Sequence, residues 1–126
     1  MLVGLTDTDN QEVVEHMASQ TLNIRLWDKD GVAWSDSVLD IQGEVLAVSQ
    51  FTLYGFLKGN KPDFHQSMQA DSARKLFEFY VEKLREMYKP EKIQTGKFQA
   101  KMEVGSVAHG PITIQYYAGG FGEETV

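Results

Sequence analysis

Residues 44–53 of the chain read Glu-Val-Leu-Ala-Val-Ser-Gln-Phe-Thr-Leu. The first half of this segment is a nearly continuous apolar run, and such a run is typical of a strand that is covered on both faces. The second half turns polar abruptly at Ser49. We therefore predict a central strand over residues 44–53 that ends in a polar cluster, Ser49-Gln50-Phe51-Thr52.

The segments on either side of this strand predict two helices. Downstream, an apolar stripe at helical spacing runs from Asp71 until Pro90 ends it, and its members are Ala73, Leu76, Phe77, Tyr80, Leu84 and Met87. Upstream, the same spacing predicts a helix over residues 10–22. Asp9 and Glu12 stand there in the positions of a capping box.

Shorter patterns predict the remaining elements. Apolar runs bounded by turn residues predict strands over residues 2–5, 24–27, 32–34, 101–106 and 112–118. Asp28 to Gly31 is turn chemistry, so the strands on either side of it are expected to form a hairpin. Residues 54–70 show no clear period, and we predict a long loop of the kind that is usually functional. The chain after Gly119 is expected to fray.

The order of these elements predicts one α/β domain over residues 1–126, with a mixed sheet and helices packed against it. The chain has no cysteine, which excludes a disulfide framework, a thiol nucleophile and a cysteine-based zinc site. We find neither a run of about 18 apolar residues nor a signal pattern. A cytoplasmic protein without membrane spans is therefore expected.

The sequence offers few conventional catalytic groups. His16, His65 and His109 lack the paired spacing of metal ligands, so no metal site is expected. Ser49 and Ser67 lack the glycine-flanked turn of a serine hydrolase nucleophile. The polar cluster at the end of the central strand remains as the candidate site, and the alternative is a strand end with solvated hydroxyl groups.

The charge pattern limits nucleic-acid binding to a local contact. A net charge of −6 argues against a protein that coats nucleic acid, because Lys and Arg drive such binding. Four lysines fall in two short segments, and they are Lys58, Lys61, Lys97 and Lys101. These lysines either grip the end of a nucleic acid or are ordinary solvated side chains.

Four sequence blocks, in order along the chain, resemble the signatures of one enzyme family. They are Ser49-Gln50-Phe51-Thr52-Leu53, Leu57-Lys58-Gly59-Asn60-Lys61-Pro62-Asp63-Phe64-His65, Gly96-Lys97-Phe98 and Gly110-Pro111-Ile112-Thr113. Together they resemble the D-aminoacyl-tRNA deacylases, also called D-tyrosyl-tRNA deacylases. The resemblance implies a β/β/α layered arrangement with barrel-like sheets and two main helices. It also implies a homodimer that needs no cofactor.

The same resemblance implies a reaction and the residues that perform it. Such enzymes hydrolyse the ester that joins a D-amino acid, or glycine, to the terminal adenosine of tRNA, as a proofreading step in translation. A cis Gly110-Pro111 turn would enter the partner's pocket and exclude L-amino acids. The cluster Ser49, Gln50, Phe51 and Thr52 would be catalytic, with the backbone N–H groups of Phe51 and Thr52 stabilising the oxyanion. We favour water as the nucleophile, and direct attack by Thr52 is the alternative.

Two further residues are assigned to the substrate by resemblance. Phe98 and Met102 would line the adenosine pocket, because an aromatic face and a thioether suit a purine. The alternative is that both are plain core residues of a strand.

The chain also departs from the family pattern. Family members usually carry an N-terminal hairpin before the strand that here starts at Met1, so we expect an uncovered sheet edge in a truncated or degenerate enzyme. Ala108 stands where the family turn has Asn, which removes a hydrogen bond across that turn. Two rival functions stay open: an impaired deacylase that acts as a nucleic-acid-binding or interaction module, and a general esterase for small molecules.

Overall fold

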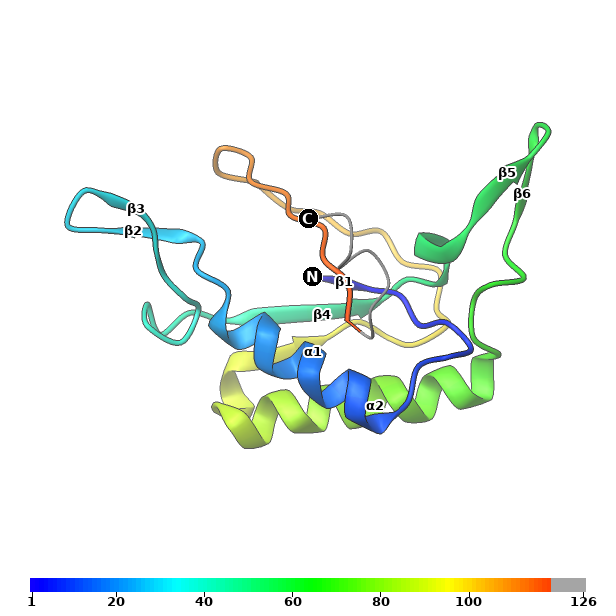
Figure 1. Ribbon diagram of the computed structural model, residues 1–126, viewed down its shortest axis with the longest axis horizontal. Coiled ribbons are helices and arrows are strands. Elements are labelled where there is room, and N and C mark those ends of the chain that lie inside the picture. Colours follow the sequence, from blue (N-terminus) through cyan, green and yellow to red (C-terminus); the bar gives the residue numbers. More distant parts are fainter. Residues whose placement is uncertain (119–126) are drawn as a thin grey trace.

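A three-stranded parallel sheet with two helices on one face forms the body of the protein (Figure 1). The computed structural model describes residues 1–118. The sheet has the order β1-β4-β7, where β1 is Leu2–Val3, β4 is Val45–Ser49 and β7 is Ile93–Thr95. The central strand β4 therefore has a hydrogen-bonded neighbour on each side, which fixes the position of its carboxyl end.

Helices α1 (Gln11–Asn23) and α2 (Ala70–Met87) confirm the two predicted helices. Each turns an apolar face toward the sheet, and the core comprises Val14, Ala18 and Leu22 from α1, Phe77, Tyr80, Val81 and Leu84 from α2, and Val3, Val45, Ala47 and Ile93 from the sheet. No helix within residues 1–118 has the length and apolar character needed to cross a membrane.

The predicted cap of α1 was wrong by one residue. Asn10 caps the helix, because its side-chain oxygen accepts a hydrogen bond of 3.0 Å from the Val13 N–H group. Asp9 instead accepts a hydrogen bond of 2.8 Å from the Thr6 N–H group. Its carboxylate therefore stabilises the turn before the helix.

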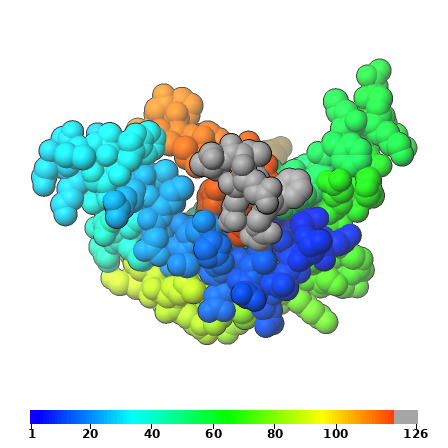
Figure 2. All heavy atoms as spheres, in the orientation of Figure 1, coloured from blue at the N-terminus to red at the C-terminus, as the bar shows by residue number. Residues whose placement is uncertain are grey.

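Two hairpins stand out from the body of the molecule at opposite ends of the view in Figure 2. The first joins β2 (Trp27–Lys29) to β3 (Val32–Asp36) and confirms the predicted hairpin. The second joins β5 (Phe56–Lys58) to β6 (Lys61–Asp63). This second hairpin corrects the prediction of a long loop over residues 54–70.

The central strand is shorter than expected, and one of its two faces is only partly covered. It ends at Ser49, and the chain then forms a 3-10 helix, η1 (Phe51–Tyr54); a second, η2 (Pro90–Lys92), precedes β7. Val45 and Ala47 are buried beneath the helices. On the other face Val48 is also buried, whereas Leu46 is 48% exposed. Described residues therefore cover that face of β4 near its carboxyl end but not at Leu46.

The strands predicted over residues 101–106 and 112–118 are absent from the part of the chain that the structure describes. This segment lies over the sheet without pairing to it, and its apolar residues Val104, Val107, Ile112 and Ile114 are exposed. The α/β class is confirmed, with two helices and several small sheets, but residues 1–118 form no closed barrel.

Candidate active site

The carboxyl end of β4 is held in place by hydrogen bonds on both sides of the turn into η1. The Gln50 N–H group donates to the Val3 carbonyl at 2.8 Å, which continues the pairing of β4 with β1. One residue later, the Ser67 hydroxyl donates to the Phe51 carbonyl at 2.8 Å. The backbone from Gln50 to Phe51 is therefore fixed by contacts from two separate segments.

Phe51 and Thr52 supply the first two amides of η1. The first amides of a helix have no acceptor within that helix, so these two N–H groups are suited to an external acceptor. The Thr52 hydroxyl accepts a hydrogen bond from the Gln50 side-chain amide. Phe51 is 59% exposed, and its ring meets the Phe64 ring edge to face with 5.1 Å between centroids.

A pocket of about 1030 Å³ opens beside this turn. Its lining includes Ser49, Gln50 and Phe51 from the predicted cluster, together with Phe98 and Met102. Among residues 1–118, the lining does not include Thr52, Gly110 or Pro111. The structure thus unites five of the eight predicted site residues in one pocket.

Phe98 lines the pocket and also packs against the edge of the hydrophobic core. Its ring lies 6.0 Å from the Phe77 ring, and the Arg74 guanidinium lies 4.9 Å from the Phe98 centroid. Arg74 is itself oriented by a 3.0 Å hydrogen bond to the Gln99 side chain. These contacts fix the orientation of the ring while part of it lines the pocket.

Met102 is held by the loop that precedes it. Its sulfur accepts a hydrogen bond of 3.4 Å from the Lys97 N–H group. Its terminal methyl lies 3.0 Å from the point where a Cβ on Gly96 would stand. The absence of a side chain at Gly96 therefore lets Met102 fold back, and the side chain remains 40% exposed at the pocket.

Gly110 and Pro111 lie in an exposed turn, and the peptide bond between them is cis as expected. Gly110 has a φ of +114°, which L side chains rarely adopt. The two residues that follow, Ile112 and Thr113, line the pocket described above.

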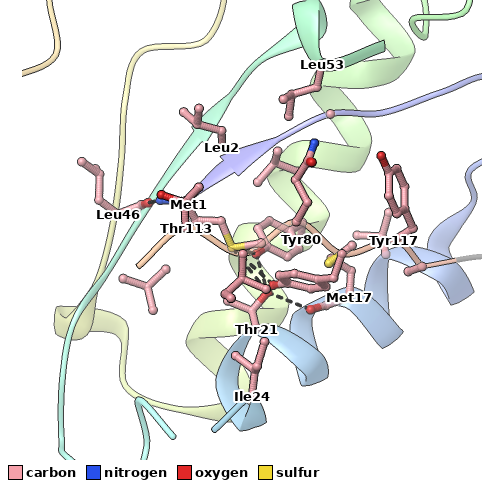
Figure 3. Close-up of a pocket in the computed structure, with 18 of the residues that line it drawn as sticks. Met1, Leu2, Met17, Thr21, Ile24, Leu46, Leu53, Tyr80, Thr113 and Tyr117 are labelled. Atoms are coloured by element: carbon pink, nitrogen blue, oxygen red, sulfur yellow. Dashed lines mark hydrogen bonds between the residues drawn. The ribbon is translucent and has the colours of Figure 1, made fainter. Parts of the chain in front are cut away.

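A second cavity of about 720 Å³ lies between α1, the sheet and residues 112–118. Figure 3 shows Met1, Thr21 and Tyr80 directed toward one another inside it. The Thr21 hydroxyl lies 2.8 Å from the Tyr80 hydroxyl and 2.9 Å from the Tyr116 hydroxyl. Burial raises the pKa of the Tyr80 phenol well above its usual range, so this cluster is neutral and joins three segments.

A model of the D-Tyr-tRNA(Tyr) deacylase family matches residues 1–117. The chain belongs to this family.

Named members of the deacylase family are closely similar to the chain. A D-aminoacyl-tRNA deacylase 1 of Danio rerio is 49% identical over 116 residues, and that of Bos taurus is 47% identical over 116 residues. Each match covers 91% of this chain and 56% of the relative, so the chain spans about half the length of these relatives. A Drosophila melanogaster D-aminoacyl-tRNA deacylase is 42% identical, with 90% of this chain and 72% of the relative covered.

A solved structure shows the same deacylase fold. The c-Myc DNA Unwinding Element Binding Protein superposes with a TM-score of 0.85 at 46% identity, covering 90% of this chain and 76% of that chain. The match confirms the layered α/β arrangement with two main helices.

Sequence reasoning missed several residues at the deacylase family's signature turn. Phe64 and Ser67 contact Phe51, and both line the larger pocket. They fall in residues 54–70, where no periodic pattern marks them. Thr21 lies on the buried face of α1, but it is polar and so is absent from the apolar pattern that predicts this helix.

Proposed function

We propose that this chain hydrolyses the ester bond of D-aminoacyl-tRNA and of glycyl-tRNA, releasing the amino acid and the tRNA. One observation carries the proposal: a single pocket contains the strand-end residues Ser49, Gln50 and Phe51 together with Phe98 and Met102. Membership of the deacylase family and the names of its relatives support the same reaction.

The chemistry rests on the backbone of the η1 turn. The N–H groups of Phe51 and Thr52 stabilise the oxyanion that develops as the ester carbonyl is attacked. The contacts from Val3 and Ser67 hold this backbone in place before the substrate arrives, which lowers the cost of organising it during the reaction. Water is the nucleophile, because the Thr52 hydroxyl is hydrogen-bonded to an amide that offers no basic group.

Phe98 and Met102 bind the terminal adenosine. A ring fixed by Phe77 and Arg74 offers a stacking surface that loses little entropy when a base binds. The exposed thioether of Met102 adapts to the edge of the purine. An adenosine bound in this way would bring the ester of the terminal ribose close to the η1 turn, where Phe51 lines the same pocket.

The selectivity for D-amino acids and glycine comes from the Gly110-Pro111 turn of a second copy of the chain. This turn is exposed and lies outside the pocket lining of its own chain, which favours contribution across a dimer. Leu46 of the sheet and Ile112 of the segment that lies over it are both exposed, and together they offer the apolar surface that such a dimer needs. An L side chain would collide with backbone atoms of the turn, whereas a D side chain would point away.

The experiment compares deacylation of one tRNA charged with a D-amino acid, the matching L-amino acid or glycine. We expect rapid cleavage of the D and glycyl esters and slow cleavage of the L ester. An amino-acid ester without the nucleotide serves as the control substrate and should be cleaved poorly.

Two results would contradict this proposal. Equal cleavage of the simple ester would indicate a general small-molecule esterase. Binding of tRNA without cleavage of any ester would indicate a nucleic-acid-binding module with the deacylase fold.

A further inference from the structure

The β5–β6 hairpin carries side chains that the proposed reaction does not use. Its register pairs Phe56 with Asp63 and Lys58 with Lys61. Because side chains alternate between the two faces of a strand, these four residues lie on one face of the hairpin. We call it the basic face; Leu57 and Pro62 pair on the opposite face.

The two lysines of the basic face stand directly opposite each other, and both are exposed. Within residues 1–118, neither forms an ion pair. Like charges in directly opposed positions destabilise a hairpin, so the pair is unfavourable in the absence of an anion. A chain with a net charge of −6 therefore concentrates positive charge on a projecting element, where a polyanion would relieve the repulsion.

The acidic group of the basic face is already engaged. Asp63 accepts a hydrogen bond of 2.8 Å from the His65 N–H group and lies 2.6 Å from its ring Nδ1 atom. These hydrogen bonds hold the pKa of the Asp63 carboxyl below its ordinary value. Asp63 thus orients the imidazole ring and does not pair with either lysine, so both lysines are available to bind external anions.

Two aromatic rings complete the surface. The rings of Phe56 and His65 meet edge to face with 5.2 Å between centroids. Phe56 is 40% exposed, and the His65 side chain is 67% exposed. Exposed rings beside lysines are suited to unpaired nucleotides, because rings stack on bases while cations bind the phosphates. The bases of a duplex are stacked on each other and leave no face for such rings.

The hairpin begins directly after η1 and projects from it (Figure 1). At its base, the Phe64 ring contacts Phe51, and both residues line the larger pocket. A strand of nucleotides on the hairpin would therefore lead to the pocket that we assign to the terminal adenosine.

We propose that the basic face of the β5–β6 hairpin binds the single-stranded nucleotides that precede the terminal adenosine of the tRNA. Lys58 and Lys61 contact phosphates, and the Phe56 and His65 rings stack on bases. The identity of the RNA rests on the proposed function, whereas preference for a single strand rests on the hairpin alone.

The test measures binding of a single-stranded RNA that ends in CCA and carries no amino acid. Binding is followed by fluorescence anisotropy at several salt concentrations. The variant Lys58→Gln/Lys61→Gln should bind about tenfold more weakly. The slope of log K against log salt concentration should be shallower by about 1.4, which is about 0.7 for each lost phosphate contact. The matched control Lys29→Gln/Lys75→Gln removes two exposed lysines from other elements and should bind like the unchanged protein. Equal binding by both double variants would overturn the proposal.

A second pair of variants tests the stacking. Phe56→Ala should weaken binding about tenfold, whereas Leu57→Ala on the opposite face should leave it unchanged. Equally tight binding of a blunt RNA duplex, or no binding of the single strand, would overturn the inference.

This readout is independent of catalysis. If the lysine and Phe56 variants lose RNA binding but the unchanged protein cleaves no ester, the inference stands and the proposed function fails. If the protein cleaves D-aminoacyl-tRNA while these variants keep their RNA binding, the inference alone fails.

Discussion

The Thr52 hydroxyl is the side-chain oxygen next to the proposed oxyanion amides, and it accepts a hydrogen bond from Gln50. If water attacks, Thr52→Ala should keep most of the single-turnover rate on D-aminoacyl-tRNA. Removal of a true nucleophile costs roughly 10⁴-fold or more. Thr95→Ala, at the exposed end of β7 and outside the lining of the larger pocket, is the control. A loss of several orders of magnitude in a folded Thr52 variant would identify Thr52 as the nucleophile.

Gly110 is a position where the backbone itself restricts the residue type. A Cβ at Gly110 would lie 3.1 Å from Ile112 Cγ1 and 3.2 Å from the Ile112 nitrogen, and the φ of +114° would add strain of about 1–3 kcal/mol. Because Ile112 lines the pocket, we expect Gly110→Ala to lower D-aminoacyl-tRNA cleavage at least about tenfold. The measurement is the deacylation rate on D, L and glycyl substrates.

Gly105 provides the control for this substitution. A Cβ there would have no atom within 4 Å, and its φ is outside the left-handed region. Gly105→Ala should therefore leave all three rates unchanged. Two results would contradict the proposal that backbone atoms of the Gly110-Pro111 turn exclude L-amino acids. One is an unaltered rate of D-aminoacyl-tRNA cleavage by Gly110→Ala, and the other is rapid cleavage of the L ester by the unchanged protein.

At the scale of elements, Thr21 joins the two helices to the C-terminal segment. Thr21→Val keeps the shape of the side chain but removes the oxygen that contacts both Tyr80 and Tyr116. A buried phenol that loses its partner costs about 1–3 kcal/mol, so the free energy of unfolding in urea should fall by that amount. Ser19→Ala, on the exposed face of α1, should change it little. An unchanged midpoint for Thr21→Val would show that the cluster adds no stability.

The sequence correctly predicted the elements in which apolar residues mark the buried positions. The stripe from Ala73 to Met87 predicts α2 because the core lies along one side of it, and the apolar run after Glu44 predicts β4 for the same reason. The β5–β6 hairpin has strands of three residues, and none of these residues is buried, so no apolar period marks it. Its turn residues, Gly59 and Asn60, were the available signal.

Long-range contacts, or their absence, account for the errors near the C-terminus and at part of the site. Val104 and Ile112 have the composition of strand residues, but no described strand pairs with their segments. The strand-end cluster was predicted from the break in polarity at Ser49, and the structure places three of its members in one pocket. The contribution of Ser67 depends on a contact across sixteen positions, which no local pattern contains.

The apolar surface that carries Leu46 and Ile112 predicts that two copies of the whole molecule associate. Leu46 and Ile112 line both cavities, so the apolar surface is continuous across them. Light scattering should give a mass of twice 14.2 kDa. Leu46→Glu should shift the protein toward monomer because it places a charge on this face, whereas Leu57→Glu on the β5–β6 hairpin should not. A monomer with full deacylase activity would contradict the proposed dimer.

The lysine positions of the β5–β6 hairpin also determine how a protease would cut it. Gly59 follows Lys58, whereas Pro62 follows Lys61, and trypsin does not cleave before proline. Only the bond after Lys58 is therefore open to trypsin in this hairpin, and projecting turns are the preferred places for such nicks. An RNA strand lying on the basic face would shield that bond. The rate of tryptic cleavage after Lys58 therefore reports whether RNA is bound to the hairpin. We expect this rate to fall as the RNA concentration rises, while trypsin continues to cut elsewhere in the chain.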